Sequence, residues 1–204
     1  MKGQLRIGSV ENPVGKYLPK DGWVVIFSAH EKIPEREKLM FLLIHKNAST
    51  SLRKSHDQPE KLEKYYSVEE FNNSEYTKVV ILRDPWDRFI SAIRQVYKLG
   101  ISRKTIEGMI SYLESHPEEE INTHLVSQSW FLKDRKIDYY LKLENIQEDW
   151  KVLEKKFNLN PLPLYRVTEA QKRRNIEVLF DKDLKERALK YLERDYELIS
   201  KVFQ

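Results

Sequence analysis

Residues 39–44 (LMFLLI) form a continuous apolar run that ends abruptly in polar residues. The run has the length of a strand, and a strand that is apolar on both faces belongs in the middle of a parallel sheet covered by helices. His45 and Lys46 follow it, and then a stretch of small residues, NASTS, from Asn47 to Ser51. We therefore expect a buried strand whose carboxyl end carries a lysine and several hydroxyl groups.

Three further stretches have the composition of strands. They are residues 23–28 (WVVIFS), 77–82 (TKVVIL) and 137–141 (IDYYL). Capping residues and apolar residues at helical spacing predict helices near residues 47–51, from 67, and over 85–98, 105–115, 121–132, 147–157 and 184–203. Strands that alternate with helices predict an α/β fold with a mainly parallel central sheet flanked by helices.

The length of the chain favours one globular domain. A chain of 204 residues buries one good core but is short for two, and no linker rich in proline, glycine or serine divides it. We expect residues 1–204 to form a single domain, in which residues 1–38 are an N-terminal extension with a short strand or hairpin.

Composition excludes several functional classes. Cysteine is absent, so the chain has no disulfide framework, no thiolate zinc site and no cysteine nucleophile. It shows no apolar core of a signal peptide and no window of about 18 to 20 apolar residues, so we expect a soluble, cytoplasmic protein without a membrane span. The net charge of +4 favours an anionic ligand weakly. No basic stripe indicates a nucleic-acid partner.

The first candidate anion site lies at the end of the apolar run. The backbone N–H groups of residues 47–51 at a helix start would face an anion, and Lys46 would add a full positive charge. Ser49, Thr50 and Ser51 supply hydroxyl donors. The stretch is not a Walker A motif, because it lacks the glycines and the lysine at the far end. An ordinary helix cap beside a surface lysine is the alternative.

The second candidate anion site follows the strand at residues 77–82. Arg83 leaves this strand, and Ser91 lies two turns along the next helix, so both could bind one phosphate, with the arginine as a fork of donors. The alternative is a surface ion pair between Arg83 and Asp87. In α/β sheets ligands bind beyond the carboxyl ends of the strands, which is where both stretches lie.

Taken together, the two stretches resemble a known pair of motifs. HKNASTSL at residues 45–52, followed by VVILRDPWDRFISAIRQVY at 79–97, is similar to the signature of sulfotransferases that use 3'-phosphoadenosine 5'-phosphosulfate (PAPS). Residues 122–128 (NTHLVSQ), 138–150 (DYYLKLENIQEDW) and 191–198 (YLERDYEL) resemble further elements of the Golgi-type carbohydrate sulfotransferases. The resemblance covers roughly residues 39–200 and implies a P-loop-like sulfotransferase fold in a soluble relative.

The resemblance implies roles for individual residues. Lys46 would stabilise the oxygen that leaves sulfur, and the 5'-phosphosulfate would be held by the loop residues Asn47, Ala48, Ser49, Thr50 and Ser51. Arg83 and Ser91 would bind the 3'-phosphate. Lys172, Arg173 and Arg174 would close over the nucleotide from the C-terminal side.

The acceptor side departs from the family pattern. His45 stands where the family usually has proline, Leu125 replaces a tryptophan, and Ser127 replaces a proline. A base must take the proton of the acceptor hydroxyl, and the candidates are His124, with Gln128 one helical turn away, and His56. Glu144 is expected to orient loop groups. No spacing of metal ligands is seen, so we expect no metal.

The sequence therefore predicts transfer of a sulfuryl group from PAPS to a hydroxyl group, that of a carbohydrate in the first instance. Two rivals remain open. One is a nucleotide-dependent kinase with a similar phosphate cradle, which the missing Walker glycines and the lack of a magnesium carboxylate weaken. The other is a non-catalytic protein that binds a nucleotide or a sulfated glycan, which the altered acceptor-side element favours.

Overall fold

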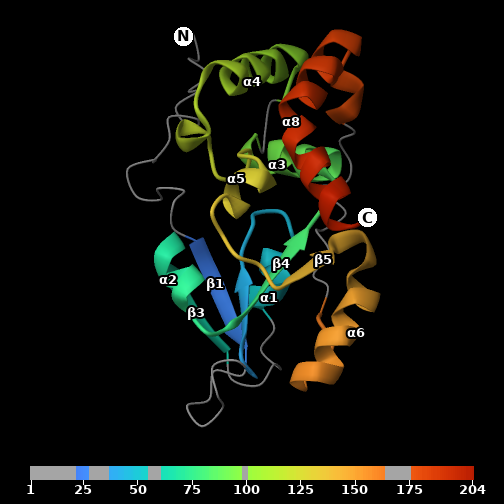
Figure 1. The fold of residues 1–204 in the computed structure, drawn as a ribbon. Helices are drawn as coiled ribbons and strands as arrows, with labels where there is room; N and C mark the ends of the chain where they lie inside the picture. The colour runs from blue at the N-terminus through green and yellow to red at the C-terminus, as the bar shows by residue number, and fades with distance from the viewer. Residues whose placement is uncertain (1–21, 28–36, 55–60, 98–100, 164–175) are drawn as a thin grey trace, which may run out of the picture.

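The computed structural model describes residues 22–27, 37–54, 61–97, 101–163 and 176–204. These residues form a five-stranded sheet in the order β3-β1-β2-β4-β5, with helices on both of its faces (Figure 1). The strands are β1 (Gly22–Phe27), β2 (Leu39–Leu42), β3 (Lys61–Tyr66), β4 (Thr77–Leu82) and β5 (Tyr139–Lys142). The predicted α/β fold class is confirmed.

The sheet is mixed, with its parallel part at β2, β4 and β5. β2 pairs in parallel with β4, and β4 pairs in parallel with β5. β1 instead pairs antiparallel with both β2 and β3. Leu42 lies opposite Val80 in the register of β2 and β4. The residues that follow these two strands therefore leave the sheet at the same edge.

β3 is a strand that the sequence did not predict. Its residues KLEKYY are mostly polar, and Leu62 on this strand is 47% exposed. β3 lies at one end of the sheet order and pairs with β1 along six residues, from Gly22 opposite Tyr66 to Phe27 opposite Lys61. Backbone pairing with a buried neighbour holds this edge strand, so it needs no apolar run of its own.

The helices follow the predicted order. They are α1 (Ser49–Arg53), α2 (Val68–Asn73), α3 (Pro85–Val96), α4 (Arg103–Ser115), α5 (Gln128–Leu132), α6 (Ile146–Phe157) and α8 (Lys182–Val202), with 3₁₀ turns η3 (Glu118–Glu120), η4 (Leu143–Asn145) and η5 (Ile176–Leu179). In the described ranges, none of the helices combines the length and the apolar character needed to cross a membrane.

Two buried clusters separate the sheet from its helices. On one face, alternate strand residues such as Met40 and Val80 pack with Phe89 of α3, Ile110 of α4 and Leu192 of α8. α8 lies beside α3 and α4 in Figure 1, and α5 also contacts it. The layer formed by α3, α4, α5 and α8 therefore covers this face of β2 and β4.

The opposite face carries the smaller cluster. Phe41 and Val79 pack there with Leu52 of α1 and with Trp150 of α6. The Trp150 ring stacks on Phe41 with ring centroids 5.4 Å apart, and its Nε1 donates a hydrogen bond to the Asn160 carbonyl at 3.0 Å. The sheet is thus the middle of three layers, as expected for strands that are apolar on both faces.

Capping residues set the starts of two helices as predicted. The Ser67 hydroxyl accepts from the Glu70 N–H, and the Glu70 carboxylate accepts from the Ser67 N–H, which completes a capping box before α2. Pro85 is the first residue of α3, and the Asp84 carboxylate accepts from the Asp87 N–H at 2.9 Å. Pro85 therefore sits where its missing N–H costs nothing.

The prediction of one helix over residues 121–132 is wrong, because only Gln128–Leu132 is helical there. The Ser127 hydroxyl accepts from the Trp130 N–H and so starts a new helix at Gln128. The Asn122 side chain accepts from the His124 N–H and fixes a turn instead. Short polar side chains compete with the helix for backbone groups, which the apolar spacing does not reveal.

Candidate active site

The two predicted anion-binding stretches meet at the carboxyl ends of β2 and β4. The Asn47 side chain, which is 2% exposed, donates from Nδ2 to the Ile81 carbonyl at 2.9 Å. The Arg83 guanidinium donates from Nη1 to the Lys46 carbonyl at 3.3 Å. Hydrogen bonds therefore join the loop after β2 directly to the end of β4.

The loop after β2 has an unusual backbone. Lys46 and Ala48 have positive φ values of 71° and 60°, in the left-handed region that favours glycine. α1 begins at Ser49 with Ala48 as its N-cap, and no side chain caps it. The expected capping of this helix by serine, threonine or asparagine side chains is therefore wrong, because Asn47 bonds to Ile81 and Gln128 instead.

The other residues of the predicted cradle differ in exposure. Ser49 is half-buried, Thr50 is exposed and Ser51 is 3% exposed. Arg83 is half-buried after β4, and Ser91 is half-buried on α3. The structure thus brings Arg83 and the loop after β2 to one edge of the sheet, and Ser91 lies further along α3.

The Gln128 side chain links the ends of β2 and β4 through hydrogen bonds. The sequence analysis did not predict this role. It is fully buried, and its Nε2 donates to the Arg83 carbonyl at 2.8 Å. Its Oε1 accepts from the Arg83 N–H at 3.0 Å and from Asn47 Nδ2 at 2.6 Å. One amide therefore fixes the positions of Asn47 and Arg83 relative to each other.

Asp195 in turn holds Gln128. This fully buried carboxylate of α8 accepts from the Gln128 N–H at 2.9 Å and from the Ser129 N–H at 2.8 Å. The Glu144 carboxylate, just after β5, accepts from the Asp84 N–H at 2.8 Å and steadies the turn after β4. Glu144 thus orients a backbone group of a neighbouring loop, the kind of role predicted for it.

Arg88 is the site residue that the sequence analysis missed. It is 1% exposed on α3, and its Nε donates to the His45 carbonyl at 3.2 Å. Among the described residues its Nη2 has no hydrogen-bond partner. Burial lowers its pKa, while Asp195 acts in the opposite direction. Arg88 lies three residues after the buried Pro85 and four before the buried Ala92, so helical spacing could have placed it inside.

Positive groups crowd this edge. Burial lowers the pKa of Lys46, and Arg83 and Arg88 lower it further. An anion bound among these three side chains would relieve both their mutual repulsion and the cost of burying their charges. The cluster therefore has the electrostatic character of an anion site.

Two histidines complete the cluster. The rings of His45 and His124 stack with centroids 4.3 Å apart and planes inclined by 28°. Burial lowers the pKa of His124 to about 4, with Lys46 and Arg88 adding to the effect. Burial also lowers the pKa of His45 to about 3, and His124 is the next cause. Both rings are therefore neutral at pH 7.

Some predicted site residues lie outside the described residues. They are His56, Lys172, Arg173 and Arg174. Within the described ranges, no three or more histidine and carboxylate side chains gather in a way that could hold a metal ion.

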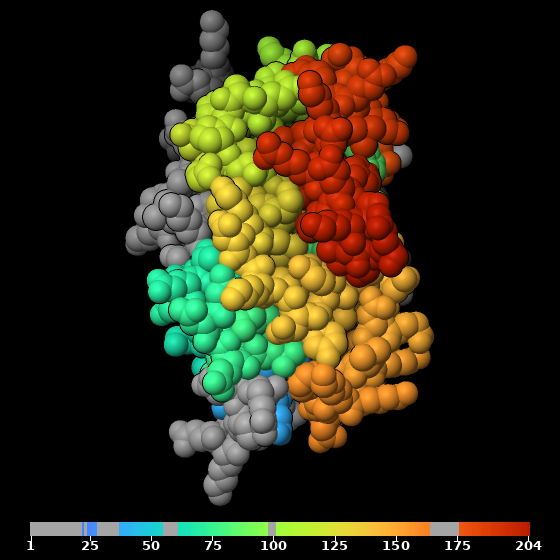
Figure 2. All heavy atoms as spheres, in the orientation of Figure 1, coloured from blue at the N-terminus to red at the C-terminus, as the bar shows by residue number. Residues whose placement is uncertain are grey.

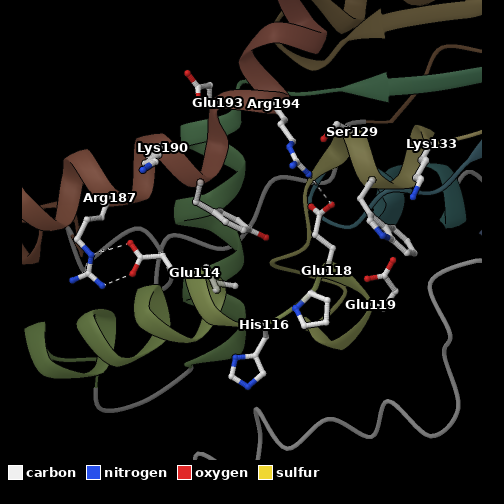
Figure 3. A pocket seen from close by; sticks show the side chains of 14 residues that line it. Glu114, His116, Glu118, Glu119, Ser129, Lys133, Arg187, Lys190, Glu193 and Arg194 are labelled. Atoms are coloured by element: carbon white, nitrogen blue, oxygen red, sulfur yellow. Dashed lines mark hydrogen bonds and ion pairs between the residues drawn. The ribbon is translucent and has the colours of Figure 1, made fainter.

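A separate pocket of about 950 Å³ lies between α4, η3, α5 and α8 (Figure 3). Arg187 pairs with Glu114 across it at 2.6 Å, and Arg194 lies 3.9 Å from Glu118. Ser129 lines this pocket, whereas the side chain of the preceding Gln128 reaches Arg83. None of the predicted site residues that the structure describes lines it. In Figure 2 the segment around α5 lies in the middle of this face, beside α8.

Comparison with known proteins identifies the family of the chain. Searches of curated proteins and of solved structures found no match. The family model described as "Sulfotransferase family" matches residues 37–200, which include both strand ends, Gln128 and Asp195. The matched region spans most of the 204 residues. The chain therefore belongs to the sulfotransferase family.

Proposed function

We propose that the protein transfers the sulfuryl group of PAPS to a hydroxyl group of an acceptor, in the first instance a carbohydrate. The observation that carries the proposal is the cationic cluster of Lys46, Arg83 and Arg88, assembled at two adjacent strand ends by Asn47 and Gln128. Membership of the sulfotransferase family supports sulfuryl transfer in general. The donor and the acceptor are the proposed parts.

The residues present fit a donor with two anionic ends. Arg88 Nη2 is a buried donor without a hydrogen-bond partner among the described residues. Ser49, Thr50 and Ser51 form the first turn of α1, three to five residues after Lys46, whereas Arg83 and Ser91 belong to the next strand end and its helix. One group of donors suits a phosphosulfate, and the other suits a second phosphate.

The proposed mechanism relies on positioning and on fixed positive charge. PAPS, when bound, supplies a sulfuryl group whose transfer leaves negative charge on the oxygen that bridges to the 5'-phosphate. Lys46 stabilises that oxygen. The loop residues 47–51 would hold the 5' end, Arg83 and Ser91 would hold the 3'-phosphate, and Lys172, Arg173 or Arg174 would close over the nucleotide. His124 or His56 takes the proton of the acceptor hydroxyl.

A thermal shift assay tests the donor. The product nucleotide 3'-phosphoadenosine 5'-phosphate should raise the melting temperature, because a ligand that binds only the folded protein stabilises it. ATP with magnesium is the comparison ligand for a kinase. Stabilisation by ATP with magnesium alone would overturn the proposal.

A transfer assay tests the acceptor and separates an enzyme from a binding protein. PAPS carrying labelled sulfate is incubated with a panel of glycans, phenols and alcohols. Labelled glycans support the proposed acceptor class, and labelled phenols or alcohols alone would replace it. Tight nucleotide binding with no labelled product from any class would favour the non-catalytic binder.

A further inference from the structure

Asn122 lies between η3 and α5 and holds His124 through a single oxygen. Its Oδ1 accepts a hydrogen bond from the His124 backbone N–H at 2.9 Å and lies 3.1 Å from His124 Nδ1. A backbone N–H can only donate, so the amide atom that faces it must be the oxygen. The same oxygen faces the imidazole.

This contact decides which nitrogen of His124 carries the proton. A neutral imidazole has one N–H and one nitrogen with a free lone pair. Because Asn122 Oδ1 can only accept, Nδ1 must be the protonated nitrogen. The lone pair of His124 then lies on Nε2.

The stacked ring of His45 fixes the orientation of His124. Its centroid lies 4.3 Å from that of His124, which restricts rotation of both rings. The His45 backbone is itself held, since its carbonyl accepts from the buried Arg88 at 3.2 Å. Lys46 is the next residue in the chain, so the stacked pair adjoins the proposed sulfuryl site.

We infer that Asn122 is a positioning residue that presents Nε2 of His124 as the base for the acceptor hydroxyl, with His45 as the flat support for its ring. The inference rests on the proposed function, because a hydroxyl acceptor must lose its proton as its oxygen bonds to sulfur. It selects His124 over His56 for that task. It also assigns a role to His45, which stands where the family usually has proline.

The chemistry balances with these groups. The acceptor O–H bond breaks and its proton moves to His124 Nε2, while the acceptor oxygen forms a bond to sulfur. The bond between sulfur and the bridging oxygen breaks, and its electron pair leaves with the 5'-phosphate beside Lys46. The His124 imidazolium then keeps its Nδ1–H bonded to Asn122 Oδ1, which stabilises the new positive charge.

The surroundings keep His124 unprotonated before the reaction. Lys46 and Arg88 face His124, and Arg53, Lys46 and Arg88 face His45. All these groups are cations, so they oppose protonation of either ring. An amide at position 122 leaves this balance unchanged, whereas a carboxylate there would favour a proton on His124.

The tautomer can be measured without any substrate. In protein labelled with ¹⁵N-histidine, long-range ¹H–¹⁵N spectra distinguish the Nδ1–H form from the Nε2–H form. The protein has five histidines, and the His124→Gln variant identifies the signal of His124. We expect the Nδ1–H form in the wild type and a loss of that preference in Asn122→Ala. An Nε2–H form in the wild type, or an unchanged tautomer in Asn122→Ala, would overturn the inference.

Steady-state kinetics test the consequence for transfer. Asn122→Ala should lower kcat on the order of 10²-fold while the KM for the nucleotide stays nearly constant. Asn122→Asp should restore the tautomer and much of kcat, and it should move the acid limb of the pH profile to higher pH. Thr123→Ala is the neighbouring control and should match the wild type. Equal kcat values for Asn122→Ala and the wild type would contradict the role.

Substitutions of His45 test the support. His45→Phe keeps a flat ring and should retain most of kcat, whereas His45→Ala should lose at least about tenfold. Equal losses in both variants would overturn the stacking role. Circular dichroism melts confirm that each variant folds.

The two proposals fail in different ways. If the wild type labels no acceptor but His124 shows an Asn122-dependent Nδ1–H form, the proposed function fails and the positioning of His124 stands. If the wild type is active and Asn122→Ala changes neither tautomer nor kcat, the proposed function stands and the inference falls.

Discussion

Lys46 and Arg83 carry like charges at adjacent strand ends. In the proposed reaction Lys46 stabilises charge in the transition state, whereas Arg83 binds a phosphate of the nucleotide. Lys46 follows β2 and lies beside the hydroxyl-rich loop, where negative charge develops only as sulfur is transferred. Arg83 lies after β4, and its guanidinium already donates to the Lys46 carbonyl. It would contact a phosphate whose charge is constant throughout the reaction. The two residues should therefore affect different kinetic constants.

Substitution of each cation tests this division. Lys46→Ala should lower kcat about 10²- to 10³-fold with little change in nucleotide affinity, as expected for a group that stabilises charge formed in the transition state. Arg83→Ala should instead weaken nucleotide binding by about 1.5–3 kcal/mol, the typical value of a hydrogen bond to a charged group. Calorimetry and initial rates give the two quantities. Lys155→Ala, on the exposed face of α6, is the control, and equal effects of the first two variants on both quantities would contradict the roles.

His45 should make stability depend on pH. The folded-state pKa of about 3 lies below the value of about 6.5 expected in the unfolded chain. Between these pH values the unfolded chain binds a proton that the folded protein does not, so the free energy of unfolding rises with pH. This stability is fully present above about pH 6.5 and is lost as the pH falls toward 3.

The His45→Phe variant should therefore lose part of this slope. Its melting temperature should fall less than that of the wild type between pH 7 and pH 4.5, as measured by calorimetry. His116→Phe removes an imidazole outside the cluster and is the control. The same slope in His45→Phe and the wild type would show that His45 does not contribute.

Single residues also show how far the sequence could lead. Lys46 and Arg83 could be expected to lie close together because they follow apolar strands, whose ends meet by the rules of parallel sheets. Arg88 follows no strand, and a charged residue on an amphipathic helix usually faces solvent, so only its helical spacing from Pro85 and Ala92 could have indicated its burial. The left-handed backbone conformation at Lys46 and Ala48 could not be predicted either, since neither residue type favours it.

α5 is a helix of five residues whose position depends on another element. Too short to be stable alone, it is anchored by the Asp195 carboxylate from α8, which accepts from its first two N–H groups. Asp195 also compensates the buried charge of Arg88. α8 therefore fixes the position of α5, and Gln128 at the start of α5 in turn fixes the residues after both strands.

Asp195→Asn should destabilise the protein by about 3 kcal/mol. The substitution removes the compensating charge and brings an amide N–H toward a backbone N–H. Urea unfolding measures the loss. Asp183→Asn on the same helix is the control, because its carboxylate lies 3.9 Å from Arg187 at the exposed surface and should change stability by less than about 0.5 kcal/mol. Similar losses in both variants would contradict the role of Asp195.

Element order was more predictable than element ends. Apolar runs and capping residues predicted the starts of β2, β4, α2 and α3, because those signals act locally, whereas β2 and α3 each end two residues before the predicted end. α5 could not be bounded in this way, since its anchor lies 67 residues further along the chain. Contacts between residues far apart in sequence leave no periodic pattern.

β1 ties the first part of the described chain into the middle of the sheet. It lies between β3 and β2, and Val24, Val25, Ile26 and Phe27 are at most 1% exposed. The matched family region begins at residue 37, after this strand. The matched region alone therefore lacks a strand on which both faces of the core depend.

Two truncations test this dependence. A chain that starts at residue 38 should lose cooperative unfolding, because it exposes the edge of β2 and the apolar residues that β1 covers. A chain that starts at residue 21 keeps all of β1 and is the matched comparison. Thermal melts followed by circular dichroism distinguish them, and indistinguishable melts would show that β1 is dispensable.

Among the described strands β3 stands at one end of the sheet order, and its polar composition has a consequence for behaviour at high concentration. An unpaired strand edge offers N–H and C=O groups to any other extended chain, and apolar edge strands promote aggregation in this way. Lys61, Glu63 and Lys64 place charges of both signs along this edge. The polar residues that kept β3 from being predicted as a strand thus oppose pairing of this strand with a strand of a second molecule.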